Sequence, residues 1–169
     1  LLEDLEVDKW KRGLDINLTS AFLMTKEAMK VLRKQKMGGS LVYVASKNAF
    51  APGAGFGGYS VTKAGMLQLM RIAALEGGSV GIRCNAVNPD AVFDNSKLWA
   101  GGVREQRAAA HGVKPEELED FYASRNILKA RVRSEDVAHS VAYLLSDESS
   151  RTTGAVIAVD GGVSAAFPR

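Results

Sequence analysis

Tyr59 and Lys63 stand four residues apart in residues 58–76, a stretch whose composition and spacing predict a helix. Residues at i and i+4 share one face of a helix, so we expect the phenol and the ammonium group to be neighbours. A free tyrosine has a pKa near 10, and bringing that pKa close to 7 requires about 4 kcal/mol. A positive charge about 4 Å away at an effective dielectric constant of 20 contributes roughly this amount. The pair therefore predicts a tyrosine that can act as an acid or base at neutral pH.

A third polar group, Ser46, comes 13 residues before Tyr59 and directly after the apolar residues 41–45. The run LVYVA predicts a strand that is buried on both faces, as in a parallel sheet. In open α/β sheets, ligands bind beyond the carboxyl ends of the strands. We therefore expect Ser46 to reach the same crevice as Tyr59 and Lys63. The alternative is a surface tyrosine–lysine pair, worth a few tenths of a kcal/mol.

Helices and strands alternate along the chain. Helices are predicted over residues 9–35 with a break near Asn17, over residues 58–76, from Pro115 onward, and from a cap at Ser134 to about Ser146. Strands are predicted over residues 41–45, 82–87 and 156–160. This alternation implies a parallel sheet, and three strands are few for a whole domain. The predicted fold class is α/β: the C-terminal half of a doubly wound, Rossmann-like fold, with three parallel strands and flanking helices.

Composition narrows the classes of function. The 169 residues correspond to about one domain at roughly 150 residues per domain. A net charge of +3 and the lack of a long apolar run argue against nucleic-acid and membrane partners. The single cysteine, Cys84, fits a reducing compartment, so we predict a cytoplasmic protein. His111 and His139 lie far apart with no cysteine nearby, and no metal site is predicted.

The reactive residues and their surroundings resemble the short-chain dehydrogenase/reductase family over nearly the whole chain. That family has a Ser, then Tyr-x-x-x-Lys, with an Asn on the preceding helix. Ser46, Tyr59-Ser-Val-Thr-Lys63 and Asn17 match this pattern. Further matching segments are VYVAS, IRCNAVNP, AYLLSDE and TGAVIAVDGG. A Tyr-x-x-x-Lys match alone is a weak signal, and the placed Ser and Asn make it strong.

The resemblance implies roles for individual residues. Tyr59 would exchange a proton with the substrate oxygen, Lys63 would hold the nicotinamide ribose and lower the pKa of Tyr59, Ser46 would hydrogen-bond the reacting oxygen, and Asn17 would anchor a water leading to solvent. The implied cofactor is NAD, with NADP as the alternative, and its expected contacts are Tyr59, Lys63, Pro89, Asp90 and Val92. The sequence departs from the family where Asp90 replaces a Gly and where Asp94 stands near the position of a Thr.

No Gly-rich turn in the sequence directly follows a predicted strand and leads into a helix. Residues 1–169 are therefore predicted to be the C-terminal part of a short-chain dehydrogenase/reductase domain, with the N-terminal dinucleotide-binding half absent from this chain. This piece alone is expected to be inactive. The helices over residues 9–35 and 58–76 resemble those that the family pairs between subunits, which implies a homodimer or homotetramer.

A narrower resemblance is carried by NPDAVF and by residues 99–122 and 159–169. These segments are similar to the dehydrogenase half of bifunctional rhamnulose-1-phosphate aldolase/lactaldehyde (alcohol) dehydrogenases. They imply oxidation of a small aldehyde or alcohol such as lactaldehyde in a sugar catabolic pathway, as part of a longer aldolase/dehydrogenase. The alternatives are an inactive fragment or relative that serves as an oligomerisation scaffold, and a sugar dehydrogenase or ketoreductase. Residues 90–112 would set the substrate, and Trp99, Phe121 and Tyr122 either line a lid or pack this insert.

Overall fold

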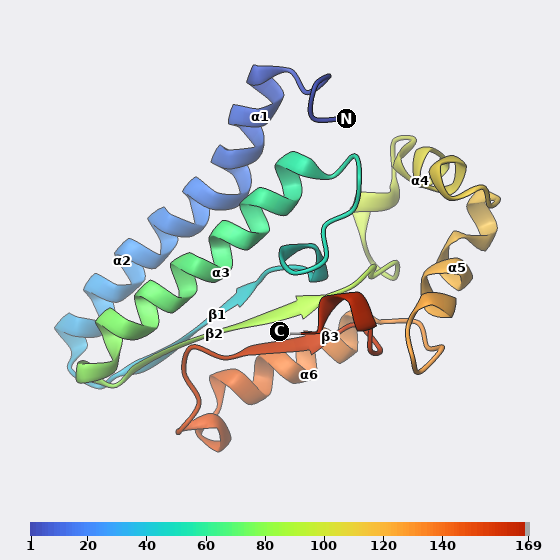
Figure 1. The fold of residues 1–169 in the computed structure, drawn as a ribbon. Helices are drawn as coiled ribbons and strands as arrows, with labels where there is room; N and C mark the ends of the chain where they lie inside the picture. The colour runs from blue at the N-terminus through green and yellow to red at the C-terminus, as the bar shows by residue number, and fades with distance from the viewer. Residues whose placement is uncertain (168–169) are drawn as a thin grey trace.

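A three-stranded parallel sheet forms the centre of the computed structural model, which describes residues 1–167 (Figure 1). The strand order is β1 (Gly39–Val44), β2 (Ile82–Pro89) and β3 (Val156–Val159). The central strand β2 is almost entirely buried, as expected for a parallel strand covered on both faces. The predicted α/β fold with three parallel strands is confirmed. Pro168 and Arg169, the last residues of the segment 159–169, lie outside the described residues.

The helix predicted over residues 9–35 is interrupted where the sequence indicated. Helix α1 (Val7–Leu14) and helix α2 (Ser20–Gln35) are joined by a π-helical turn, Asp15–Thr19, which contains Asn17. This turn packs on helix α3 (Gly57–Gly77) through Leu18, whose side chain lies over Gly65. A Cβ atom at Gly65 would approach Leu18 to 2.9 Å, so glycine permits this close contact.

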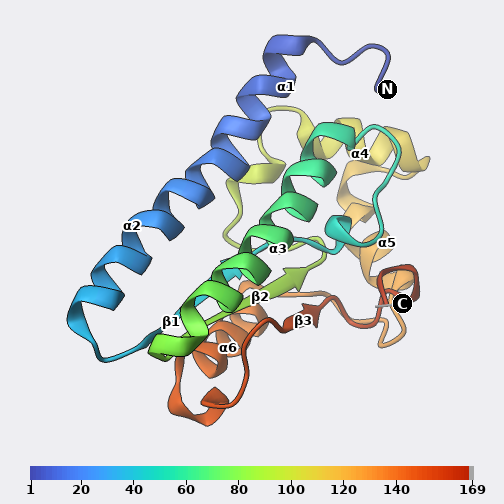
Figure 2. The same cartoon turned by 60° about the vertical axis from the view of Figure 1, so that its left-hand side comes forward.

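Helices α2 and α3 lie on one side of the sheet, and helix α6 (Ser134–Leu145) lies on the other (Figures 1 and 2). The core between α3 and β2 includes the fully buried Leu67, Met70, Ile82 and Cys84. Burying each such aliphatic side chain contributes about 1.5–3 kcal/mol. Tyr43 of β1 and Thr25 of α2 add a buried hydrogen bond of 2.8 Å between their hydroxyl groups. These contacts hold α3, and therefore its first turn, in a fixed position relative to the strand ends.

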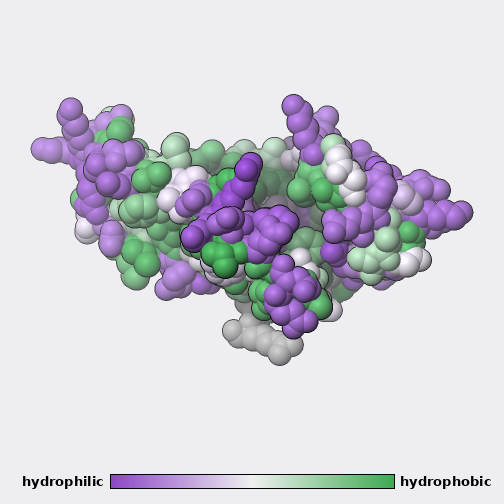
Figure 3. All heavy atoms as spheres, turned by 90° about the horizontal axis from the view of Figure 1, so that it is seen from above, coloured by the Kyte–Doolittle hydropathy of each residue, from purple (hydrophilic) through white to green (hydrophobic). Residues whose placement is uncertain are grey.

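Two further helices stand beyond the carboxyl ends of the strands, toward which the strand arrows of Figure 1 point. They are α4 (Val103–His111) and α5 (Leu118–Arg125), and a short turn at Pro115–Glu117 leads into α5 as predicted. The sequence does not predict α4, because only Ala108 of this helix is buried and no apolar stripe marks it. Hydrophilic side chains gather over this end of the molecule (Figure 3).

The start of α6 differs from the prediction. Ser134 is the first residue of this helix and not its cap. Its backbone N–H donates to the carboxylate of Asp94 at 3.0 Å, and its hydroxyl donates to the same carboxylate. The hydrogen bond from the Ser134 side chain lowers the pKa of Asp94. A carboxylate 40 residues earlier in the chain therefore does the work expected of the local serine.

No helix within residues 1–167 combines the length and apolar character needed to cross a bilayer. In the same described part of the chain, no three His, Cys, Asp or Glu side chains gather in a way that could hold a metal ion.

Candidate active site

A cleft of about 790 Å³ opens beyond the carboxyl ends of β1 and β2. This volume lies within the range of about 300–1,000 Å³ that is usual for small-molecule sites. Its walls come from the end of β1, the first turns of α3, the segment after β2, and helices α4 and α5. Six of the seven sequence-predicted site residues line it: Ser46, Tyr59, Lys63, Pro89, Asp90 and Val92. Asn17 does not line it and lies on the π-helical turn that packs against α3.

Ser46 sits just past the end of β1 with 8% of its surface exposed. Its backbone is extended, and its side-chain oxygen accepts a hydrogen bond of 3.2 Å from the backbone N–H of Asn48. This bond uses one lone pair and leaves the hydroxyl proton for another partner. Ser46 is therefore held in place as a donor at the cleft.

Tyr59 lies in the first turn of α3 and keeps 37% of its surface exposed. Burial is the largest influence on its phenol and raises the pKa, while a hydrogen bond with the Ser46 side chain acts in the opposite direction. The predicted lowering of this pKa by Lys63 is wrong for the chain by itself. A raised pKa keeps the phenol protonated at neutral pH. In this structure Tyr59 can therefore donate its phenolic proton at neutral pH.

The ammonium group of Lys63 binds the backbone of β1 and not the phenol of Tyr59. Its Nζ donates a hydrogen bond of 2.9 Å to the carbonyl oxygen of Val44 and lies 5.7 Å from the centroid of the Tyr59 ring. Burial lowers the pKa of Lys63. This hydrogen bond joins α3 to the last residue of β1 and holds the ammonium group beside the carboxyl end of that strand.

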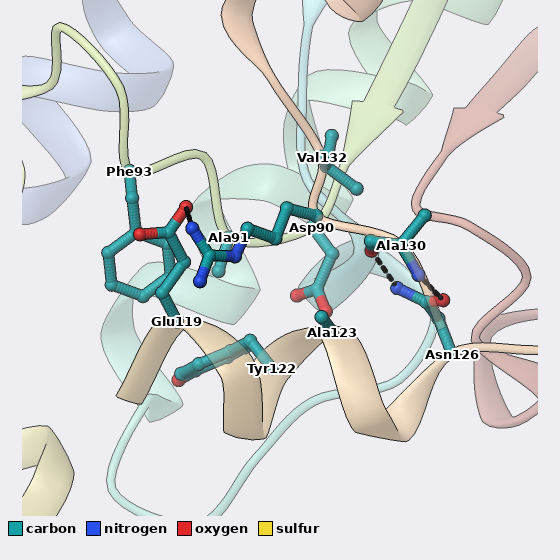
Figure 4. A pocket seen from close by; sticks show the side chains of 10 residues that line it. Asp90, Ala91, Phe93, Glu119, Tyr122, Ala123, Asn126, Ala130 and Val132 are labelled. Atoms are coloured by element: carbon teal, nitrogen blue, oxygen red, sulfur yellow. Dashed lines mark hydrogen bonds and ion pairs between the residues drawn. The ribbon is translucent and has the colours of Figure 1, made fainter. Parts of the chain in front are cut away.

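Asp90 is engaged with α5. Its carboxylate is 8% exposed and forms an ion pair of 3.1 Å with Arg125, whose guanidinium carbon lies 4.0 Å from the centroid of the Tyr122 ring. Figure 4 shows Asp90 directed toward α5 near Ala123. The end of α5 is held in turn by Asn126, which exchanges two hydrogen bonds with the backbone of Ala130 (Figure 4). The carboxylate of Asp90 is thus part of the link between β2 and α5.

The segment after β2 is fixed by its backbone. The carbonyl oxygen of Val92 accepts a hydrogen bond of 2.7 Å from the indole of Trp99, and Val92 pairs in parallel with Val132. The Trp99 ring stacks on Phe93 with 4.1 Å between centroids, and Tyr122 meets both rings edge-on. Trp99 and Tyr122 therefore line the cleft and also pack the insert, and Phe121 packs the insert without lining the cleft. The packing alternative is confirmed, and a lid stays a prediction.

Four cationic or titratable residues that the sequence did not assign to a site also line the cleft: Lys47, Arg107, His111 and Arg125. The sequence assigned no role to His111. In the structure its ring packs against Phe121, and its Nε2 lies 3.1 Å from Nη2 of Arg107. Arg107 and His111 are four residues apart on α4, which places them on one helix face. That spacing could have linked them, but nothing local indicates that this face turns toward Ser46 and Tyr59.

The donors at the cleft fit one end of a dinucleotide. Tyr59 and Lys63 offer a hydroxyl and an ammonium group to ribose hydroxyls, and the cleft has room for a nicotinamide ring beside a small substrate. The segment from the end of β1 to the first turn of α3 contains Gly53, Gly55, Gly57 and Gly58, but the short 3-10 turn Lys47–Ala49 separates these glycines from the strand. Among the described residues 1–167, no Gly-rich turn therefore leads directly from a strand end into a helix in the form that cradles a pyrophosphate.

Comparisons with known proteins identify relatives of this chain. A family model described as enoyl-(acyl carrier protein) reductase matches residues 1–164. The chain is 41% identical over 167 residues to the uncharacterized oxidoreductase YuxG of Bacillus subtilis, which covers 99% of this chain and 24% of that protein. It is 34% identical over 164 residues to cis-4-hydroxycyclohexanecarboxylate dehydrogenase of Sinomonas cyclohexanicum, covering 97% of this chain and 60% of that one.

A solved structure agrees at the level of the fold. Sorbitol-6-phosphate 2-dehydrogenase SrlD from Erwinia amylovora superposes with a TM-score of 0.88 at 25% identity, covering 95% of this chain and 62% of that one. The chain thus spans less than two thirds of the length of each of these three proteins. A family match over nearly all residues, relatives above 30% identity and a shared fold lead to one conclusion: this chain belongs to the short-chain dehydrogenase/reductase family of oxidoreductases.

Proposed function

We propose that the intact protein is an NAD(P)-dependent oxidoreductase that interconverts a small alcohol and its carbonyl compound, with Tyr59 as the acid and base. The observation that carries this proposal is the meeting of Ser46, Tyr59 and Lys63 at one cleft beyond the strand ends. Two of the relatives above are named as dehydrogenases of a hydroxycyclohexanecarboxylate and of sorbitol 6-phosphate. Those names support alcohol–carbonyl chemistry as the class of reaction.

Each residue has a distinct task in this proposal. A bound nicotinamide cofactor supplies or accepts the hydride. Ser46, positioned by Asn48, donates a hydrogen bond to the substrate oxygen. Tyr59 gives its proton to that oxygen during reduction and takes it back during oxidation, and its raised pKa favours the protonated form. Lys63 binds the ribose of NAD or NADP, and Asn17 serves a proton path to solvent from the turn beside α3.

The domain assignment follows the same reasoning. We propose that a dinucleotide-binding half completes the site, and that residues 1–169 by themselves show no dehydrogenase activity. Strand β1 supports this, because it is a sheet edge in the described part of the chain and its last residue, Val44, is 49% exposed. An uncovered edge strand offers backbone hydrogen-bonding groups to a further strand.

Lactaldehyde is a specific substrate candidate. Its support is the resemblance of NPDAVF and of residues 99–122 and 159–169 to the dehydrogenase half of a fused aldolase, and fusion to an aldolase in a sugar catabolic pathway belongs to the same proposal. A substrate panel with NAD and with NADP, run on the intact protein, would compare lactaldehyde with sugars and keto compounds. Turnover of a sugar or ketone in place of lactaldehyde would retain the reaction class and reject this substrate.

The decisive experiment replaces Tyr59 by Phe in the intact protein. General acid–base catalysis contributes roughly 10²–10⁴-fold to a rate, so kcat should fall by about 100-fold or more. Cofactor affinity, measured by fluorescence titration, should change little. Tyr143→Phe, on the exposed surface of α6, is the matched control and should leave kcat unchanged. Full activity in Tyr59→Phe would reject the proposal.

The second candidate function is an oligomerisation scaffold without catalysis, with a homodimer or homotetramer as the product. Exposed apolar side chains on α2 favour it: Phe22, Leu23, Met24 and Val31 are each about half exposed or more. Light scattering of the intact protein reports its oligomeric state. An assembled protein that turns over no alcohol or carbonyl compound with either cofactor would support the scaffold in place of the enzyme.

A further inference from the structure

We propose that the substrate carries an anionic group, a carboxylate or a phosphate, and that Arg107 binds this group at the wall of the cleft opposite the strand ends. This inference rests on the proposed oxidoreductase function and narrows its substrate class. It assigns a binding role to α4, the helix that the sequence did not predict.

The cleft has an excess of positive charge. Lys47, Lys63, Arg107 and Arg125 line it against one carboxylate, that of Asp90. Asp90 is already paired with Arg125, and Lys63 is bonded to Val44. Among the described residues, Lys47 and Arg107 form no ion pair with any carboxylate. Clefts lined by one sign of charge attract ligands of the opposite sign.

The cations are close enough to act on one another. Burial is the largest cause that lowers the pKa of Lys47, and the charges of Arg125 and Arg107 lower it further while those of Asp90 and Asp160 raise it. An anion bound among these groups would relieve their mutual repulsion. The excess charge is therefore a feature of the cleft and not of separate surface residues.

Arg107 is held in a defined orientation. Its guanidinium carbon lies 4.2 Å from the centroid of the Phe56 ring, and that ring lies 6.3 Å from the ring of Tyr59. Arginine has only donors, so the 3.1 Å contact makes His111 Nε2 the acceptor and His111 a neutral side chain. Stacking on one ring and bonding to another reduces the freedom that a free arginine would lose on binding a ligand.

One donor of this arginine has no partner. The Nε of Arg107 is buried and forms no hydrogen bond within residues 1–167. Buried N–H groups without a partner are uncommon in folded proteins, so the chain by itself leaves this guanidinium group incompletely satisfied. A carboxylate or phosphate in the cleft can accept charge-assisted hydrogen bonds from the Nη groups of Arg107, of which Nη2 also contacts His111. Arg125 is a poorer candidate because Asp90 already neutralises it.

An alcohol–carbonyl reaction by itself does not distinguish charged from neutral substrates, whereas an anion site at Arg107 favours the charged ones. A hydroxy acid or a sugar phosphate carries the anion, whereas lactaldehyde is neutral, so this inference and the lactaldehyde candidate exclude each other and the substrate pairs below decide between them. The carboxylate and phosphate sources can be distinguished by testing each against a neutral partner of the same shape.

The experiment uses the intact protein and matched substrate pairs. Hydroxy acids of three to six carbons are each compared with their primary amides, and sugar phosphates with the free sugars. Hydrogen bonds to charged groups correspond to about ten- to hundredfold in affinity. We expect kcat/KM for the preferred charged class to exceed that of its neutral partner by at least about tenfold. The class that shows this preference identifies the source of the anion.

Variants at Arg107 provide the second comparison. Arg107→Met should lower kcat/KM for the charged substrate by about ten- to hundredfold and change that of its neutral partner by less than about threefold. Arg107→Lys keeps the charge but not the paired donors, so it should retain part of the preference. Lys97→Gln removes an exposed positive charge just before α4 and outside the cleft, and it should leave the preference intact. Equal losses for both members of a pair would overturn the inference.

A binding measurement separates failure of this inference from failure of the proposed function. Calorimetric titration of the intact protein with the same acids and amides requires no turnover. If no compound is turned over but acids bind more tightly than amides in an Arg107-dependent manner, the reaction class is wrong and the anion site stands. If neutral compounds are turned over as well as charged ones, the oxidoreductase stands and the anion site is rejected.

Discussion

Arg125 of α5 and Asp90, the residue that follows β2, form an ion pair of 3.1 Å across 35 residues of sequence. The carboxylate is 8% exposed and the arginine side chain 29%. This pair connects the end of the central strand to a helix that walls the cleft. Asp90, which the family resemblance assigned to cofactor binding, therefore also holds α5 against the end of β2.

Asp90→Asn removes the negative charge and leaves Arg125 partly buried without a carboxylate. Loss of one partner of such a pair costs about 1–2 kcal/mol when the remaining cation keeps some access to water. We expect the free energy of unfolding, measured with urea, to fall by this amount. The matched control is Glu27→Gln, which breaks the exposed pair with Lys30 and should have no measurable effect. Equal behaviour of the two variants would show that the Asp90 pair contributes nothing.

Tyr43 and Thr25 predict an asymmetry between two substitutions. The Thr25 hydroxyl donates to the carbonyl oxygen of Ala21, so Tyr43 must be the donor in their 2.8 Å bond. Tyr43→Phe leaves every remaining group satisfied and should cost about 1 kcal/mol, whereas Thr25→Val strands the buried phenol and should cost about 2–3 kcal/mol. Thermal unfolding of both variants measures the difference. A larger loss in Tyr43→Phe than in Thr25→Val would show that the stranded phenol is not the main cost.

Gly161 and Gly154 form a second matched pair. Both have a positive φ, +67° and +73°, so alanine at either position adds backbone strain of about 1 kcal/mol. A Cβ atom at Gly161 would also lie 2.6 Å from the side chain of the buried Asn126, whereas nothing lies within 4 Å at Gly154. Gly161→Ala should therefore lower the free energy of unfolding by about 2–4 kcal/mol and Gly154→Ala by only about 1 kcal/mol. Similar values for the two would mean that Asn126 moves aside freely.

Cys84 predicts a loss of stability in alkaline solution. Burial in β2 raises the pKa of its thiol from 9.0 to about 11. The folded pKa is the higher one, so the stabilisation is complete below pH 9 and is lost as pH rises toward 11. By pH 10 the unfolded chain has gained about 1.4 kcal/mol from ionisation of this thiol.

Unfolding curves of the wild type and of Cys84→Ala, recorded between pH 8 and pH 10, test this. The variant is expected to be less stable at pH 8 because of the cavity, yet to lose less stability as the pH rises. Parallel pH profiles for the two proteins would show that the thiol does not titrate as proposed. Both proteins are compared at each pH, so the titration of the groups that they share cancels from the difference.

Local patterns were sufficient for the elements and for part of the site. The apolar run before Ser46 indicated a buried strand, and the four-residue spacing placed Tyr59 and Lys63 on one helix face. The break near Asn17 proved to be a π-helical turn. Each of these inferences depends on neighbours within one element, where backbone geometry fixes the separation of side chains.

The sequence by itself thus determined the α/β class, the parallel strands and the meeting of a strand-end serine with a helical tyrosine. Only the tertiary structure decided that Arg107 and His111 face this cleft, that Asp94 caps α6, and that the pKa of Tyr59 rises. The physical reason is that these properties depend on interactions between residues far apart in the sequence. Burial and electrostatic interactions depend on groups that are tens of residues away, and their positions are set by how the segments after β2 fold back over the strand ends.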